Sequence, residues 1–168
     1  MKVVILGYSG SGKSTTARNI GRKHNIPVLH LDTVYWMENW QVRPEEECKT
    51  IVADFMAANH SWVIEGNYKA LHQTERFQQA DKILFFNFNR FTCFFRALGR
   101  YLKYRGKTRP DIAPGCNEKF DIEFMKWILK DGRTPQKKKA YADMCRKYAD
   151  KVVIIRNQRQ LDELLEKF

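Results

Sequence analysis

The feature that most constrains this chain lies near its start, where a short apolar run leads directly into a glycine-rich loop. Residues 2–14 read KVVILGYSGSGKS, and Gly7, Gly12, Lys13 and Ser14 fill the pattern GxxxxGK[ST]. Glycine permits positive φ and carries no side chain, so several backbone N–H groups can turn onto phosphate oxygens. A helix starting at this loop would point its positive end at the same anion. The stretch therefore predicts a strand, a nucleotide phosphate site and a helix in succession.

The residues of the loop have individual predicted roles. Lys13 would bring positive charge to the phosphates of ATP, and the Ser14 hydroxyl would bind Mg²⁺. The other residues expected to hold the nucleotide phosphates are Gly7, Ser9, Gly10, Ser11, Gly12 and Thr15. A glycine turn without a ligand is the alternative, but the flanking strand and amphipathic segment favour phosphate binding.

Composition places the chain among globular, phosphate-attracting proteins. The 168 residues suit a single domain, and 30 basic against 19 acidic side chains leave a formal charge of +11. That charge does not distinguish nucleotides from nucleic acid or an anionic membrane. The four cysteines form no CxxC pair, so no zinc or redox site is predicted. No apolar run is long enough for a signal peptide or a membrane span, and we expect a cytoplasmic protein with free thiols and no membrane partner.

Two further apolar runs end in a carboxylate. The run Val28–Leu31 is followed by Asp32, and the run from Ser61 ends in Glu65. Strand ends beside a phosphate loop lie at the edge where open α/β sheets bind ligands, so both acids are site candidates. We expect Glu65 to hold magnesium, directly or through water. The alternatives are a helix-capping Asp32 and a solvated Glu65.

The segment Arg90–Arg109 has seven basic side chains and no acid. Helical spacing predicts one cationic face, with Arg96, Arg100 and Lys103, and one apolar face that packs. The apolar residues expected to pack are Phe91, Phe94, Phe95, Leu98 and Leu102. The cationic face has three interpretations: a solvated surface, a nucleic-acid or membrane patch, and a clamp on transferring phosphates. The phosphate loop favours the clamp, with Arg96, Arg100 and Arg109 neutralising the charge of the transferring group.

The rest of the chain completes an alternation of strands and helices. Residues 104–117 lack periodicity and predict a closing lid, and strands are expected at Ile83–Phe86 and Lys151–Ile155. Arg156 is a candidate to stack on the nucleotide base, while Asn157 would cap the last helix. Tyr35, Trp36 and Trp40 would either wall a substrate pocket or pack the next helix.

Three stretches carry a more specific resemblance: LHLDTVYW at residues 29–36, WVIEGNY at 62–68 and RGKTRPDIAPGC at 105–116. The alternation of elements resembles the nucleoside monophosphate kinase group of P-loop proteins. The three stretches resemble the bacterial DNA topology modulation proteins, the FlaR-related family. The resemblance implies an adenylate-kinase-like three-layer α/β fold with a five-stranded parallel sheet ordered 2-3-1-4-5. It further implies a lid at about 96–118 and an acceptor-side helical segment at about 33–60.

The resemblance also bears on the substrate. Nucleoside monophosphate kinases have a segment like DGFPR after the third strand, whose arginine contacts the acceptor, whereas this chain has EGNYK at residues 65–69. The acceptor arginine is thus replaced. Asp32 followed by aromatic residues resembles small-molecule kinases of this fold, in which such an Asp orients an acceptor hydroxyl.

Two functional hypotheses follow. The first is an ATP- and Mg²⁺-dependent phosphotransferase acting on a small-molecule acceptor, and it leaves ATP hydrolysis and a monomeric or homodimeric state open. The second is an ATP-switched, nucleic-acid-associated protein that affects DNA topology, motivated by the charge of +11 and by the family name. The clustering of basic residues in the expected lid, with no recognised nucleic-acid-binding motif, favours the enzyme.

Overall fold

The computed structural model describes residues 1–109 and 111–168, and shows a five-stranded sheet between two layers of helices. The strands are β1 (Lys2–Gly7), β2 (Val28–His30), β3 (Trp62–Glu65), β4 (Lys82–Phe86) and β5 (Val152–Ile155). The α-helices are α1 (Lys13–His24), α2 (Leu31–Tyr35), α3 (Glu45–Ala58), α4 (Gln73–Gln79), α5 (Arg90–Tyr104), α6 (Ile122–Leu129), α7 (Pro135–Lys147) and α8 (Gln158–Glu166). Two short 3₁₀ turns, η1 (Glu38–Trp40) and η2 (Asp131–Arg133), complete the described elements.

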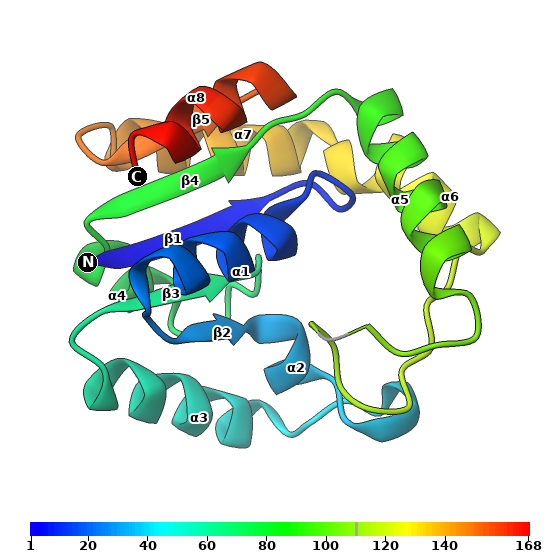
Figure 1. The fold of residues 1–168 in the computed structure, drawn as a ribbon, viewed down its shortest axis with the longest axis horizontal. Coiled ribbons are helices and arrows are strands. Elements are labelled where there is room, and N and C mark those ends of the chain that lie inside the picture. The colour runs from blue at the N-terminus through cyan, green and yellow to red at the C-terminus, as the bar shows by residue number, and fades with distance from the viewer. Residues whose placement is uncertain (110) are drawn as a thin grey trace.

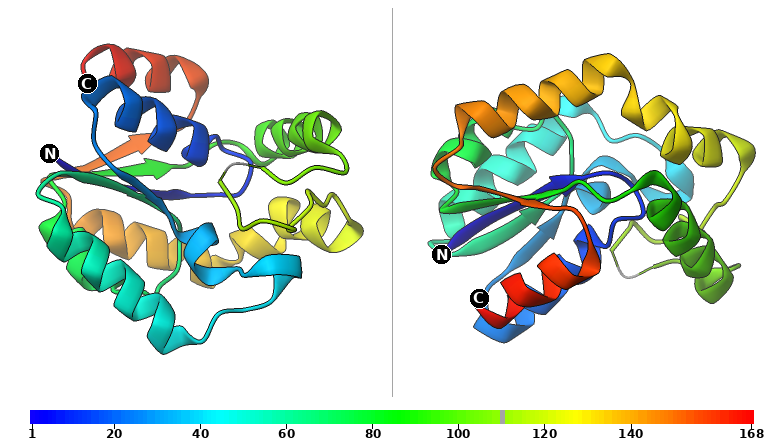
Figure 2. Two further views of the ribbon diagram at one scale, coloured as in Figure 1. Left: turned by 60° about the horizontal axis from the view of Figure 1, so that its bottom comes forward. Right: turned by 90° about the horizontal axis from the view of Figure 1, so that it is seen from above.

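All the strand pairs of the sheet are parallel, in the order β2-β3-β1-β4-β5, which confirms the fold class and strand order predicted from the sequence. The central strands are apolar throughout because both faces of the sheet are covered. In β1, Val3, Val4 and Ile5 are completely buried. Helices α1 and α8 cover one face, and α3, α4 and α7 cover the other (Figure 2).

The order of strands puts the glycine-rich loop at the centre of the carboxyl edge. Because β1 lies between β3 and β4, the loop after β1 is flanked by the ends of both neighbours. Helices α5 and α6 project beyond this edge and stand opposite α1 (Figure 1). The space between the sheet edge and α5 is therefore bounded by segments far apart in sequence.

Local signals set most helix boundaries. Asn89, Asp121 and Asn157 each accept a hydrogen bond from a backbone N–H in the first turn of the helix that follows. Asn157 is thus a helix cap, as the sequence indicated. Helix α1 ends at Asn25, which has a left-handed φ of 51° and whose N–H bonds to Gly21 O.

One prediction from the sequence was wrong in detail, and one helix was not predicted. The second strand ends at His30, and Leu31–Tyr35 form the short helix α2, so Asp32 lies in the first turn of a helix and not at a strand end. The helix is stabilised locally, because Thr33 Oγ1 donates to His30 O at 2.7 Å. Helix α4 was not predicted, since its seven residues are too short to show a clear period.

The packing face of α5 also differs from the prediction. Phe91, Phe95 and Leu102 are 61%, 66% and 64% exposed, whereas the small residues Cys93 and Ala97 are fully buried. The arginine-bearing side of the helix faces the glycine-rich loop, and small side chains allow that close approach. Phe91, Phe95 and Leu102 are consequently turned toward solvent, whereas Phe94 and Leu98 are half-buried and Phe94 packs against the core as predicted.

Among residues 1–109 and 111–168, no helix combines the length and the apolar character that crossing a lipid bilayer requires.

Candidate active site

The loop between β1 and α1 is shaped by glycines that no other residue could replace without strain. Gly10 and Gly12 have φ of +78° and +99°, and a Cβ on Gly10 would lie 2.3 Å from Cys93 O in α5. Lys13 Nζ donates to Tyr8 O at 3.1 Å, across the loop. The Ser11 side chain is buried and donates to the same carbonyl at 2.6 Å, so it stabilises the loop from inside.

Ser14 and Glu65, the pair predicted to hold magnesium, are in contact. Ser14 Oγ donates to Glu65 Oε2 at 3.1 Å, and His30 Nδ1 lies 3.1 Å from the same oxygen. Burial alone would raise the pKa of Glu65, but the hydrogen bond to His30 and the charge of Lys13 hold it below its usual range. Glu65 is therefore an ionised carboxylate beside the loop. The sequence-based reasoning did not identify His30, although it lies directly before LD in the stretch LHLDTVYW.

Asp32 lies next to this group and is held by a tyrosine. Tyr68 donates its hydroxyl hydrogen to Asp32 Oδ1 at 2.7 Å. Burial, followed by the repulsion of Glu65, raises the pKa of Asp32, while the hydrogen bond from Tyr68 and the charge of Lys13 act in the opposite direction. The two neighbouring carboxylates thus differ: Glu65 is held ionised, and Asp32 has a raised proton affinity.

The residues that replace the acceptor arginine segment have structural contacts of their own. The side chain of Asn67 forms two hydrogen bonds with the last residue of β1. Its Oδ1 accepts from Gly7 N at 2.9 Å, and its Nδ2 donates to Gly7 O at 2.9 Å. Arg76 in α4 is completely buried and donates to Tyr68 O and Leu71 O at 2.6 and 2.8 Å. These contacts lock the turn after β3 and aim Tyr68 at Asp32.

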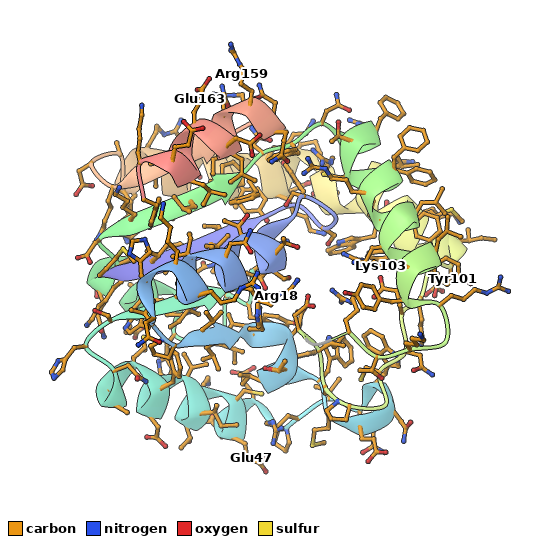
Figure 3. The ribbon with its side chains drawn as sticks, in the orientation of Figure 1. Arg18, Glu47, Tyr101, Lys103, Arg159 and Glu163 are labelled. Atoms are coloured by element: carbon orange, nitrogen blue, oxygen red, sulfur yellow. The ribbon has the colours of Figure 1, made fainter. Side chains whose placement is uncertain are left out.

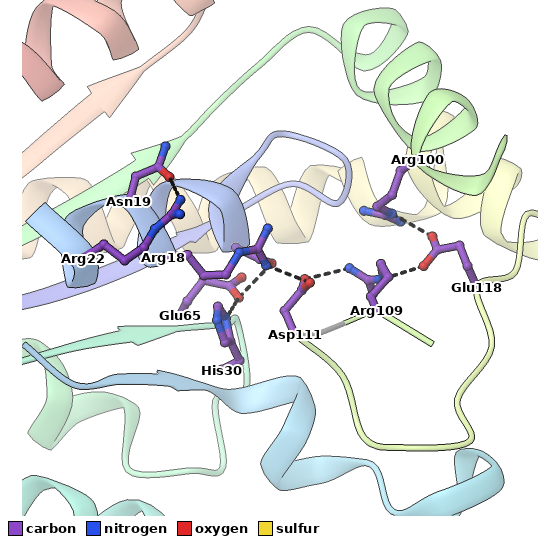
Figure 4. Close-up of polar contacts among 10 residues, drawn as sticks. Arg18, Asn19, Arg22, His30, Glu65, Arg100, Arg109, Asp111 and Glu118 are labelled. Carbon is purple, nitrogen blue, oxygen red and sulfur yellow. Dashed lines mark hydrogen bonds and ion pairs between the residues drawn. The ribbon is translucent and has the colours of Figure 1, made fainter. Parts of the chain in front are cut away.

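The arginines predicted to clamp phosphates reach the site from α5 and from the lid segment, residues 96–118. Arg96 donates to Ser11 O at 2.9 Å, and so contacts the loop directly. Arg100 donates to Glu118 Oε1 at 2.7 Å, and Arg109 donates to Asp111 Oδ2 at 2.8 Å (Figure 4). Pro110, within the same lid segment, lies outside the described residues.

Two carboxylates of the lid segment were missed, because the sequence argument treated residues 90–109 as the basic unit. Arg18 of α1 donates to Asp111 Oδ1 at 2.8 Å, and this ion pair ties the lid segment to the helix after the loop. Burial alone would raise the pKa of Asp111, but Arg109 and Arg18 hold it below the usual range. Glu118 pairs with Arg109 as well as with Arg100. The chain Arg18, Asp111, Arg109, Glu118, Arg100 runs across the site (Figure 4).

Two adjoining cavities occupy the region between α1, the sheet edge and the lid segment. The first, of about 370 Å³, is lined by the loop together with Arg18, Arg96, Lys103 and Asp111. Arg18 and Lys103 point into the space between α1 and α5 (Figure 3). The second, of about 590 Å³, is lined by Asp32, Glu65 and Tyr68 at its base. Gly10, Lys13, Ser14, Arg100 and Arg109 line both cavities, so the two meet at the end of the loop.

Aromatic side chains wall the second cavity, as one of the two interpretations of the aromatic cluster predicted. Trp36 and Trp40 line it, with ring centroids 5.3 Å apart, and both pack against the buried lid residues Ile112, Ala113 and Cys116. Tyr35 instead packs beside Tyr68, with the ring centroids 4.7 Å apart and the rings tilted by 34°.

Arg156 is separated from this arrangement. Its side chain is exposed, and it does not line the two cavities. Gln158 is the residue of this turn that approaches the loop, since it accepts from Arg96 at 2.7 Å. A third cavity of about 380 Å³, lined by Gly12, Thr15, Arg96 and Gln158, lies there. The stacking role of Arg156 stays a prediction.

The described residues fit a magnesium ion bound mainly through a nucleotide. Residues 1–109 and 111–168 contain no group of three or more His, Cys, Asp or Glu side chains arranged to hold a metal ion. Ser14 Oγ and the ionised Glu65 nevertheless offer two oxygen ligands at the end of the loop. Mg²⁺ usually takes one or two protein oxygens and completes its shell with water and phosphate.

Comparisons with known proteins are consistent with this geometry. The chain is similar to adenylate kinases: 23% identical over 151 residues to one from Clostridium perfringens, covering 74% of this chain and 65% of that protein. To one from Clostridium kluyveri it is 22% identical over 158 residues, covering 78% and 68%. The chain thus spans about two thirds of the length of these relatives. No family model matches it.

Solved structures show the same fold. Shikimate kinase from Acinetobacter baumannii in complex with shikimate aligns with a TM-score of 0.59 at 16% identity, covering 99% of this chain and 89% of that one. Shikimate kinase from Bacteroides thetaiotaomicron aligns with a TM-score of 0.52 at 19% identity, covering 99% and 95%. The chain thus has a P-loop kinase-like fold. The narrower resemblance to DNA topology modulation proteins stays a prediction.

Proposed function

We propose that the chain is an ATP-dependent phosphotransferase that moves the γ-phosphoryl group of ATP to a hydroxyl of a small molecule. The observation that carries this proposal is the position of Asp32, a half-buried carboxylate with a raised pKa, in an aromatic-walled cavity. This cavity joins the first cavity, which follows the glycine-rich loop and is called the phosphate cavity below, at Lys13 and Ser14. A hydrolase or a switch needs a nucleotide site, but it has no need of a second organic pocket at the γ-phosphate end.

The residues divide the work as follows. The loop amides and Lys13 would hold the β- and γ-phosphates of ATP. Ser14 and Glu65 would hold Mg²⁺, which would neutralise charge on the phosphate oxygens. Asp32 accepts the proton of the acceptor hydroxyl. The oxygen of that hydroxyl bonds to the γ-phosphorus as the bond between the γ-phosphorus and ADP breaks. Arg100 and Arg109 leave their lid carboxylates for the phosphate oxygens as charge moves.

The lid segment would exclude water from this transfer. Its ion pair from Asp111 to Arg18 and its contacts with Trp36 and Trp40 support a closed arrangement over the two cavities. Excluding water protects a phosphoryl group from hydrolysis and strengthens the electrostatic contacts around it.

The test is the release of ADP with and without candidate acceptors. Lys13→Ala should reduce the rate of ADP release to that measured in buffer without protein. Circular dichroism should show that the variant remains folded. Lys139→Ala, an exposed lysine of α7, is the matched control and should leave the rate unchanged. An undiminished rate in Lys13→Ala would refute the assignment.

The nucleic-acid hypothesis keeps one supporting observation, the net charge of +11. It requires binding to DNA with steep salt dependence, falling by orders of magnitude between low and moderate salt. Absence of DNA binding near physiological salt, both with and without ATP, would exclude it.

A further inference from the structure

The two cavities differ sharply in charge, although they share the end of the loop. The phosphate cavity is lined by one carboxylate, Asp111, and by six cations: Lys13, Arg18, Arg96, Arg100, Lys103 and Arg109. The second cavity is lined by five carboxylates, Asp32, Glu65, Glu118, Asp121 and Glu123, and by four cations, Lys13, Arg100, Arg109 and Lys119. The chain as a whole has a net charge of +11, so the excess of carboxylates is confined to the second cavity and is not a general property of the chain.

The excess of carboxylates over cations in the second cavity is larger when the residues that line both cavities are left out. Three of the four cations of the second cavity, Lys13, Arg100 and Arg109, also line the phosphate cavity and belong to the transfer end. Lys119 is the one remaining cation among the described lining residues, and its Nζ lies over the Trp40 ring at 5.0 Å. The part of the second cavity away from the glycine-rich loop, called the acceptor end below, therefore offers an anionic ligand few cations to pair with.

The walls of the acceptor end are flat and apolar. Trp36, Trp40, Phe124 and Trp127 line it together with Tyr68. Trp40 has a left-handed φ of 63°, which is a strained backbone conformation for a bulky side chain. The fold holds Trp40 there through its N–H, which donates to Cys116 Sγ of the lid segment at 3.3 Å. Aromatic side chains such as these offer stacking or edge-to-face contacts to a planar ring.

We infer that the acceptor is an uncharged or cationic alcohol bearing a planar ring, and not a phosphate monoester or a carboxylic acid. Its hydroxyl would lie against Asp32 and its ring among the tryptophans. A dianionic phosphate in the same place would meet Glu118, Asp121 and Glu123, while Arg100 and Arg109 are engaged by the transferring phosphoryl group or by Glu118. This inference rests on the proposed function, because it names the acceptor class for the same site.

The experiment compares ring alcohols with their own anionic derivatives. Each pair consists of a nucleoside and its 5′-monophosphate, or a cationic heterocyclic alcohol and its phosphate ester, so the ring stays constant. Binding to the full chain is measured by tryptophan fluorescence and calorimetry, alone and with a non-hydrolysable ATP analogue. At least one ring alcohol should bind at least about tenfold more tightly than its phosphate and raise ADP release above the water background. A preference for the anionic member, or no binding by either member of every pair, overturns the inference.

A charge reversal at the rim tests the cause. Glu123 is exposed on α6, so Glu123→Lys should fold normally and reduce the preference for the uncharged member about twofold to fivefold. Glu166→Lys makes the same change of net charge on the exposed end of α8, away from the cavity, and should leave the preference unchanged. Equal effects of both variants would overturn the local explanation. Binding of a fluorescent ATP analogue is measured separately, so a failure of the proposed function is distinguishable from a failure of this inference.

Discussion

The contact between the glycine-rich loop and α5 makes a quantitative prediction about Gly10. A methyl group at this position would lie 2.3 Å from Cys93 O and 3.0 Å from Cys93 C, both backbone atoms of a helix. The residue also has a φ of +78°, which L-residues rarely adopt. Gly10→Ala must therefore either shift α5 or distort the loop.

The two costs can be estimated separately. A non-glycine residue in the left-handed region costs about 1–2 kcal/mol. Relieving a backbone overlap in a packed region costs about 1–3 kcal/mol more. We expect Gly10→Ala to lower the free energy of unfolding by about 2–5 kcal/mol, which a domain with about 5–15 kcal/mol of stability survives.

Urea unfolding and ATP binding measure these effects. Gly99→Ala is the matched control for the unfolding measurement alone, because Gly99 lies within α5 and its added methyl group meets no protein atom within 4 Å, although the residue lines the phosphate cavity. That variant should gain about 0.5–1 kcal/mol from reduced backbone entropy. Gly10→Ala should also bind a fluorescent ATP analogue at least about tenfold more weakly, since the loop amides are displaced. Equal stability of the two variants, with unchanged nucleotide binding, would refute the proposed loop geometry.

Four further outcomes follow from the site and its surroundings. Burial and the charge of Glu65 raise the pKa of Asp32, so acceptor-dependent turnover should fall as the pH drops through a value above the usual pKa of about 3.9. An acid limb of kcat/KM at or below about 3.9 would contradict the assignment of Asp32 as the base. Arg18→Ala should speed tryptic cleavage within the lid segment, whereas Arg22→Ala, one turn along α1, should not; equal rates would argue against the tie between lid and helix. Arg76→Met should cost about 3–5 kcal/mol in urea unfolding because two backbone carbonyls lose their buried donor, and a cost below about 1 kcal/mol would contradict this. The exposed Phe95 should tolerate replacement by serine within about 0.5 kcal/mol, and a loss of several kcal/mol would show that this side chain is covered in solution.

Local patterns were sufficient for the strands and for the glycine-rich loop, whereas the resemblance to P-loop kinases supplied the strand order. The spacing of Gly7, Gly12, Lys13 and Ser14, together with five apolar runs, predicted the strands and the loop after the first of them. Such signals are readable because glycine conformation, strand burial and helix capping depend on a few consecutive residues. The segment with Asp32 was less well predicted, since a short helix and a continuing strand begin with the same apolar residues.

Helix α5 shows why hydrophobic periodicity alone did not predict which face of a helix is buried. The sequence separated an aromatic side from an arginine side, and hydrophobicity favoured burial of the aromatic side. The structure buries Cys93 and Ala97 and leaves Phe91 and Phe95 exposed, because the helix must approach a backbone loop and present cations to it. Which face is inward depends on what the helix packs against, and that partner is distant in sequence.

The sequence by itself therefore determined that this chain has a glycine-rich loop of the phosphate-binding pattern, an alternation of strands and helices, and a nearby supply of arginine. Only the tertiary structure decided how these charges are distributed: Asp111 and Glu118 pair with the arginines, Tyr68 holds Asp32, and the acceptor end collects acids and tryptophans. The physical reason is that ion pairing, burial and pKa depend on distances of a few ångströms between segments separated by up to 93 residues along the chain.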